Sequence, residues 1–207
     1  MKKILPVLIV ALIAFYWFTK SGDAILLEDI PPLSIDYENG LSIDNPPLQK
    51  KLERSTGLIT SSIYWIKPVA ELQARARILG IKYYRLDRES DLSPVDIAMG
   101  WGPMAKDSVL EKLNITQSNR FYYWRTNEFP IPRREIEKNS ANMHFIPANP
   151  EVVRKLKELE EDDIIQFKGY LVRVDARDGW QWNSSMSRSD TGRGACELVL
   201  VDDITRL

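Results

Sequence analysis

The sequence predicts an α+β fold dominated by bent antiparallel β-strands, with a few short helices. Residues 71–78 alternate polar and apolar side chains without a break, which is typical of a half-buried strand. Residues 164–175 are predicted to form a long strand that contains Gly169, and Asn149-Pro150 marks the start of a helix in front of it. Bent strands with a glycine bulge and a capping helix build small closed barrels. Residues 140–207 are therefore predicted to be OB-like.

The first 20 residues consist of a charged end, an apolar segment and an aromatic collar. Lys2 and Lys3 precede residues 4–18, which carry no charge and end in an aromatic run before Lys20. As a helix rising about 1.5 Å per residue, this segment would reach roughly 22 Å, against a hydrocarbon core of about 30 Å. An uncleaved anchor is the preferred interpretation, because residues 22–24 make a poor cleavage site. A cleaved signal and an N-terminal core helix are the alternatives.

The charge distribution predicts both an orientation and a class of partner. The chain carries 28 basic and 29 acidic side chains; three of the basic ones lie in residues 1–20, which leaves 25 against 29 and a net charge of −4. More positive charge precedes the apolar segment than follows it. We therefore expect a single-pass inner-membrane protein whose C-terminal domain faces the periplasm. A net-acidic domain lacks the basic surface that binds phosphate backbones, so nucleic acid is not an expected partner.

Residues 21–57 are predicted to be a linker. They carry two proline pairs, Pro31-Pro32 and Pro46-Pro47, together with several acidic residues and no sustained periodicity. Proline pairs favour extended polyproline geometry, which would hold the domain away from the bilayer. One β-rich globular domain is expected over residues 58–207, because this length is enough for a single core. With one cysteine, Cys196, it can form no disulfide within the chain.

Ordered structure is expected to begin with a short strand over residues 58–66. Residues 69–78 are ambiguous, because their apolar side chains also recur at helical spacing and their propensity favours a helix. The unbroken alternation favours a strand that continues through residues 81–86. A bend or bulge at Gly80 would join the two parts.

Two short helices are predicted next. Ser93 can cap a helix and Pro94 suits its first position, so a helix is expected from there to Gly100. A second helix is expected over residues 105–113. The aromatic residues 120–125 are then predicted to form a buried or half-buried strand.

The C-terminal third has the clearest pattern. Asn149-Pro150 caps and starts a helix of about ten residues. The strand over residues 164–175 is expected to change its buried face at Gly169 through a bulge or coil. A hairpin turn and a last buried strand are predicted at Asp178-Gly179 and at residues 195–201.

Five short motifs stand out in the domain: Leu92-Ser93-Pro94-Val95-Asp96, Gly100-Trp101-Gly102-Pro103-Met104, Ile131-Pro132-Arg133-Arg134-Glu135, Ser140-Ala141-Asn142-Met143-His144 and Thr191-Gly192-Arg193-Gly194-Ala195-Cys196. These motifs resemble a family of uncharacterised bacterial proteins that have an N-terminal membrane segment. The resemblance covers residues 58–203 and implies a bacterial setting, but it supplies no activity and no functional residues.

Five residues are candidates for a functional site. His144 is the only histidine, which excludes a His-rich metal site, and no cofactor motif is identified. Ser140 precedes His144 by four residues, so the two could act as nucleophile and general base. A structural histidine is the preferred interpretation, because no nucleophile-elbow motif is present. Aromatic side chains could form a stacking platform for a glycan, with a place in the core as the preferred interpretation. They are Tyr64, Trp65, Trp101, Trp124, Trp180 and Trp182, of which Trp101, Trp180 and Trp182 are the candidates for ligand binding.

Together these patterns predict a membrane-anchored envelope protein that acts as a non-enzymatic binding or assembly module. It would contact the membrane through residues 4–18 and would bind another envelope protein or a glycan. The alternative from a different class is a periplasmic hydrolase that uses His144 as its general base.

Overall fold

A computed structural model of the chain describes residues 33–34, 41–53, 58–59, 64–187 and 195–207. The expected membrane segment over residues 4–18 and most of the expected linker lie outside these ranges. Within them, no helix has the length and apolar character needed to cross a bilayer. The predicted fold class, α+β with a dominant share of β-strands, is confirmed.

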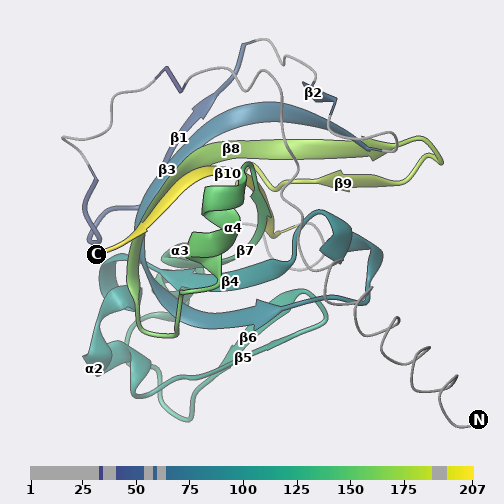
Figure 1. Ribbon diagram of the computed structural model, residues 1–207. Helices are drawn as coiled ribbons and strands as arrows, with labels where there is room; N and C mark the ends of the chain where they lie inside the picture. Colours follow the sequence, from purple (N-terminus) through teal and green to yellow (C-terminus); the bar gives the residue numbers. More distant parts are fainter. Residues whose placement is uncertain (1–32, 35–40, 54–57, 60–63, 188–194) are drawn as a thin grey trace, which may run out of the picture.

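Five strands pair in a ring that closes the sheet on itself (Figure 1). The ring runs β3, β4, β7, β10, β8 and back to β3, and every pairing is antiparallel except that of β7 with β10. It includes β3 and β4, so the barrel extends over more of the chain than the predicted residues 140–207. The strand bounds are β3 Tyr64–Tyr83, β4 Val95–Gly100, β7 Ser140–Pro147, β8 Ile164–Ala176 and β10 Glu197–Arg206.

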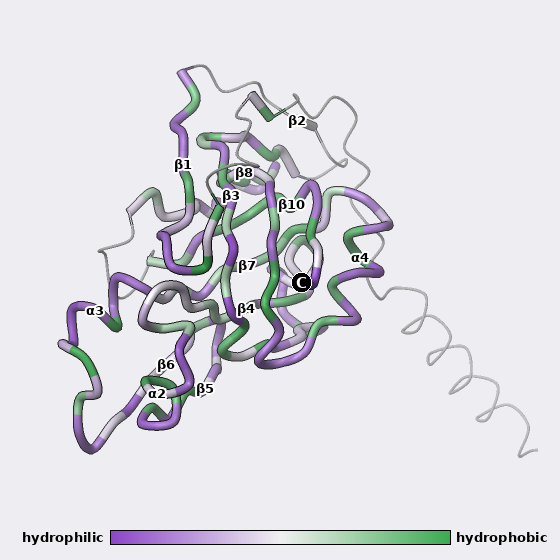
Figure 2. The backbone as a smooth tube through the Cα atoms, turned by 90° about the vertical axis from the view of Figure 1, so that its left-hand side faces the viewer, coloured by the Kyte–Doolittle hydropathy of each residue, from purple (hydrophilic) through white to green (hydrophobic). Residues whose placement is uncertain are grey.

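The remaining elements are short. The helices are η1 Arg88–Asp91, η2 Gly102–Ala105, α2 Asp107–Leu110, α3 Arg133–Lys138 and α4 Pro150–Leu156. The strands β1 Leu48–Lys51 and β2 Leu58–Ile59 pair with β3, and β9 Gln181–Asn183 pairs with β8. A separate hairpin consists of β5 Asn114–Ser118 and β6 Phe121–Arg125. Figure 2 shows α4 on one side of the barrel, and α3 and the hairpin on the other.

The long strand β8 is buried on both of its faces. Ile165, Phe167 and Leu171 belong to the larger hydrophobic cluster, which also takes side chains from the four other strands of the ring. Tyr170 and Val172 point to a second cluster on the opposite face, where Trp180 and Trp182 pack. The buried side chains therefore alternate regularly between two clusters. The predicted change of face through a bulge at Gly169 is wrong.

Gly169 instead permits a close approach between two strands. A Cβ atom at this position would lie 2.0 Å from the carbonyl oxygen of Leu200 in β10, so no larger residue fits without moving the backbone. The bulge lies in β10, where the register shifts between Val201 and Asp203. The bulge predicted near Gly80 is present, because the β3–β4 register shifts between Ile78 and Gly80.

Residues 69–78 form part of strand β3, as the alternation predicts. The helix predicted from Ser93 to Gly100 is wrong, because residues 95–100 form strand β4. Val95, Ile97 and Met99 alternate into the larger cluster, and their burial outweighs the local capping signal of Ser93-Pro94. The helix predicted over residues 105–113 is only the four-residue α2.

The helix predicted at Asn149 is confirmed as α4, although it ends at Leu156. The Asn149 side chain accepts a hydrogen bond of 2.9 Å from the N–H of Val152, which satisfies one donor of the first turn. Val152 and Leu156 reach the larger cluster from the helix.

Candidate functional site

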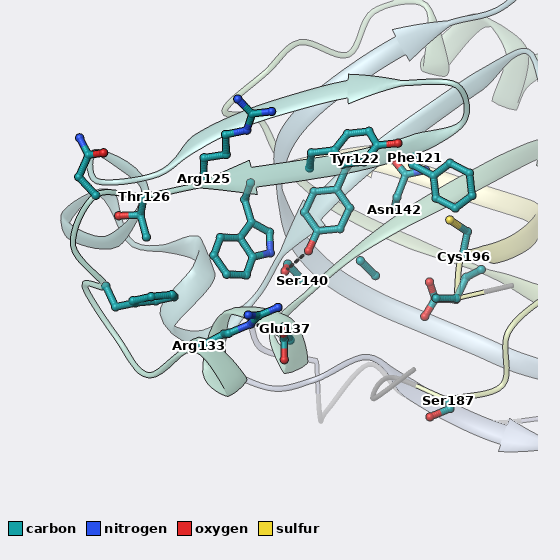
Figure 3. A pocket seen from close by; sticks show the side chains of 17 residues that line it. Phe121, Tyr122, Arg125, Thr126, Arg133, Glu137, Ser140, Asn142, Ser187 and Cys196 are labelled. Carbon is teal, nitrogen blue, oxygen red and sulfur yellow. Dashed lines mark hydrogen bonds and ion pairs between the residues drawn. The ribbon is translucent and has the colours of Figure 1, made fainter. Parts of the chain in front are cut away.

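A cavity of about 690 Å³ lies between the hairpin, α3 and one end of the barrel (Figure 3). Its volume falls within the range of about 300–1,000 Å³ that is usual for ligand sites. The walls are formed by residues 121–127 and Phe129, by Arg133 and Glu137 of α3, by residues 140–142 of β7, by Ser187, and by residues 195–197 around the start of β10.

One wall of the cavity is aromatic. The rings of Trp124 and Phe129 meet edge to face with their centroids 6.0 Å apart, and Phe129 is 51% exposed. The guanidinium of Arg133 lies 5.9 Å from the centre of the Trp124 ring, within the range of a cation–π contact. Arg133 also pairs at 2.8 Å with Glu137, one turn further along α3. The wall therefore offers apolar faces next to charged groups.

A chain of two hydroxyl groups closes one side of the cavity. The hydroxyl of Ser140 donates a hydrogen bond of 2.6 Å to the carbonyl oxygen of Ile136. Because its only proton is used there, the Tyr122 hydroxyl donates to Ser140 Oγ, also at 2.6 Å. Burial raises the pKa of Tyr122 to about 12, so this phenol stays neutral and remains a donor at physiological pH.

The hairpin that carries the aromatic wall turns through Asn119 and Arg120. Both residues have positive φ angles, 50° and 68°, which is the geometry of a tight type I′ turn. Glycine usually occupies the second of these positions, so the backbone of Arg120 is strained. Such strain persists when the surrounding structure holds the residue in place.

The side chain of Arg120 binds the turn to the barrel through two carboxylates. It contacts both oxygens of Asp87, at 2.8 and 2.7 Å, and Oδ1 of Asp96 at 2.8 Å. Its hydrogen bond to Asp87 holds the pKa of that carboxyl below the ordinary value. The guanidinium also lies 3.9 Å from the centre of the Tyr84 ring. Arg120 therefore attaches the turn to the barrel through ion pairs and a ring contact.

Amide side chains add to this attachment. Asn142 donates a hydrogen bond of 3.0 Å to the carbonyl oxygen of Arg120, and Gln117 donates one of 2.9 Å to the side-chain oxygen of Asn142. Lys82 of β3 donates to the carbonyl oxygen of Gln117 at 3.0 Å. The hairpin is therefore held in one position, and the aromatic wall with it.

The predicted pair of Ser140 and His144 does not meet. Both lie on β7 and point to the same face, but four residues of strand separate them by about 13 Å. The Nδ1 atom of His144 lies 2.9 Å from Oδ1 of Asp96, without the alignment of a hydrogen bond, and its ring lies 4.9 Å from Trp182. Ser140 is held by Tyr122 and Ile136 instead.

The three candidate tryptophans are not gathered on one surface. Trp101 is 1% exposed and belongs to the larger cluster. Trp180 and Trp182 are half-buried neighbours whose ring centroids lie 6.0 Å apart, and the guanidinium of Arg88 lies 4.6 Å from the Trp180 ring.

Of the residues that line the cavity, the sequence indicated only Ser140, as a candidate nucleophile, and Trp124, as part of a possible aromatic platform. Residues 121–124 were predicted as an aromatic strand, and the preceding Asn119-Arg120 lacks the glycine that usually marks a hairpin turn. In the part of the chain that the structure describes, no three His, Cys, Asp or Glu residues could hold a metal ion.

No family model, curated protein or solved structure matches this chain. The resemblance to a family of uncharacterised bacterial proteins with an N-terminal membrane segment therefore stays a prediction.

Proposed function

We propose that this chain is a non-enzymatic binding module whose ligand occupies the cavity between β6, α3 and the end of the barrel. The observation that carries the proposal is the cavity itself, with an aromatic wall on a hairpin that several polar contacts hold in place. A wall that is already ordered loses little conformational freedom when a ligand binds, which favours affinity. Aromatic faces beside Arg133 and Glu137 suit a ligand that has both apolar and polar groups.

The proposed setting is the inner membrane, with residues 4–18 as the anchor and the barrel in the periplasm. Its support is the sequence: a charged end, an apolar segment, an aromatic collar and a proline-containing acidic linker. The ligand would then belong to another component of the envelope.

The hydrolase alternative is not favoured by the geometry. A nucleophile and its base must approach within hydrogen-bond distance, and Ser140 and His144 lie about 13 Å apart along β7. The hydroxyl of Ser140 is already engaged in two hydrogen bonds.

The proposal can be tested with the six tryptophans of the chain as reporters. Full-length protein in lipid nanodiscs would be labelled with 5-fluorotryptophan, and each fluorine resonance assigned by a Trp→Phe substitution. Three probes would be added in turn: a mixture of random octapeptides, a chitin-type oligosaccharide and a dinucleotide. We expect at least one probe to shift the Trp124 resonance while the buried Trp101 resonance stays in place.

The two other candidate tryptophans serve as an internal comparison. A shift of the Trp180 and Trp182 resonances with no change at Trp124 would move the site to the other surface and contradict the proposal. The same conclusion follows if no probe shifts Trp124.

A further inference from the structure

We propose that the free edge of β6 binds an extended peptide segment of a partner protein by β-strand addition. This inference rests on the proposed function, because it names the class of ligand for the same cavity.

The hairpin uses only one edge of β6. Strand β6 pairs with β5 from Phe121 to Arg125, and within the described ranges no strand pairs with its other edge. An unpaired edge presents a row of backbone donors and acceptors to any chain that can lie beside it. Peptide recognition by strand addition uses such an edge.

The register shows which backbone groups point outward. A two-residue turn makes its flanking residues, Ser118 and Phe121, a hydrogen-bonded pair, and such pairs alternate along the hairpin. Tyr122 and Trp124 therefore occupy the non-hydrogen-bonded positions, and their N–H and C=O groups point away from β5. Two residues of strand separate these groups by roughly 6.8 Å, the spacing at which an added strand repeats.

The cavity follows this edge rather than one face of the hairpin. Side chains of a strand alternate between its faces, so a pocket on one face would be lined mainly by every second residue. Here all seven residues from 121 to 127 line the cavity, and no residue of β5 does. On the opposite side, residues 140–142 also line it, and they lie before Met143, where β7 begins to pair with β10. The cavity thus lies between two stretches of strand edge that pair with no other strand among the described residues.

The side chains beside the edge indicate the composition of the peptide. Arg125, at the end of β6, is exposed and forms no salt bridge with any described residue, so an acidic residue of the peptide could pair with it across the strands. Tyr123 is 47% and Phe129 51% exposed, and both offer apolar surface. A peptide that alternates β-branched or aromatic residues with acidic ones fits these neighbours.

The test begins with a peptide selected on the full-length protein. A displayed library of random decapeptides would be selected on the chain in nanodiscs, and the enriched sequences synthesised with a fluorescent label. We expect enrichment of alternating apolar and acidic residues. Their affinity would be measured by fluorescence anisotropy against matched variants of one position in β6, Trp124→Ala and Trp124→Pro.

The matched pair separates the backbone from the side chain. Both variants lose the indole, but only Trp124→Pro also loses the outward N–H, and it leaves the β5–β6 hydrogen bonds intact because this N–H does not take part in them. We expect Trp124→Pro to bind about 2- to 10-fold more weakly than Trp124→Ala, the effect of one lost hydrogen bond. Equal affinities would overturn the inference. Thermal unfolding of both variants checks that the proline variant is folded.

A second measurement tests which backbone N–H groups of the peptide form hydrogen bonds with β6. N-methylation removes one backbone N–H of the peptide at a time, and an added strand uses every second one. We expect affinity to fall at alternate positions and to change little at the positions between. An effect without this period of two would overturn the inference.

These experiments distinguish the failure of strand addition from the failure of the proposed binding function. If no peptide is enriched while the oligosaccharide shifts the Trp124 resonance, strand addition is wrong and the binding module stands. If the dinucleotide alone shifts it, strand addition is again wrong. If no probe shifts it, both proposals fail, because strand addition at this cavity rests on the proposed function.

Discussion

Arg120 combines a backbone position that suits glycine with a side chain that the surrounding structure requires. Its positive φ places it at the second position of a tight turn. Its guanidinium is the partner of Asp96, a carboxylate that is 1% exposed. Any substitution that removes this guanidinium leaves the Asp96 carboxylate as an uncompensated buried charge. Glycine has a second effect, because it also removes the backbone strain of the positive φ.

Arg120→Ala is therefore expected to destabilise the fold by about 3–5 kcal/mol. Arg120→Gly should lose the same ion pairs but be about 1 kcal/mol less destabilised, because glycine adopts a positive φ without strain. Urea unfolding of the two full-length variants beside the parent chain measures both differences. An alanine variant as stable as the parent would show that Asp96 does not depend on this arginine.

Asp87 gives a prediction for acid stability. The hydrogen bond from Arg120 lowers the pKa of Asp87 in the folded state. As the pH falls from the unfolded value of about 3.9 toward this lower pKa, the unfolded chain holds a proton that the folded chain does not, so stability is lost. Above pH 3.9 this contribution is fully present.

We expect Asp87→Asn to have a shallower loss of stability below pH 4 than the parent protein. The free energy of unfolding, measured in urea at pH steps from 6 down to 3, gives the slope for each chain. Parallel slopes would mean that Asp87 has the same pKa in the folded and unfolded states. Asp175, which Arg173 also holds at a lowered pKa, is left unchanged in both proteins.

Among the elements, the pairing of β8 with β10 requires that the two backbones lie unusually close together at Gly169. At Gly169 a Cβ would meet the backbone oxygen of Leu200 at 2.0 Å, and a backbone cannot rotate away. At Gly80 a Cβ would meet Oε1 of Gln117 at 2.9 Å, which is the far end of a flexible side chain. The two glycines therefore differ in what an added methyl group would displace.

Gly169→Ala is expected to cost about 3 kcal/mol or more, because the two strands must separate. Gly80→Ala should cost less than about 1 kcal/mol, since Gln117 can move and alanine lowers the entropy of the unfolded chain. Denaturant unfolding of both variants tests the contrast. Similar losses in the two proteins would contradict the role given to Gly169.

Strands β3 and β8 could be predicted from the sequence because their patterns are local. Strand β4 could not, because Ser93-Pro94 carries a helix-capping signal, and only pairing with β3 and β7 makes the extended form favourable. The wrong prediction of a change of face in β8 has a related cause. An alternating pattern is expected to have one buried face, whereas β8 packs against hydrophobic clusters on both of its faces. Local patterns predict a strand, but tertiary neighbours decide how many of its faces are buried.

At the scale of the whole molecule, the cavity joins residues that lie far apart in the sequence. Residues 121–142 and 195–197 meet there through the parallel pairing of β7 and β10, which no local pattern indicates. His144 and Ser140 could be singled out by their chemistry and Trp124 by its aromatic ring, yet nothing in the sequence indicated that Tyr122 and Arg133 would lie beside Ser140 and Trp124 in the cavity. The fold class was therefore more predictable than the site.

For the complete protein in its cell, we expect the N-terminal segment to be retained. Its proposed role as an anchor predicts that the mature chain still contains residues 1–24, since the cleavage site there is poor. Intact-mass measurement of protein extracted from membranes gives the answer. A mature chain that starts at residue 25 would make the protein a released periplasmic one.

The closure of the ring by β10 has a consequence for biosynthesis. Until residues 197–206 have emerged, β7 and β8 have no strand between them, and each keeps an edge that could pair with another nascent chain. A chain made from its N-terminus can assemble β3, β4, β7 and β8, but it gains the pairings of β10 only after residues 197–206 have been made. The barrel therefore closes only after β10 has emerged, and a chaperone that covers the open edges of β7 and β8 would be most useful before that point.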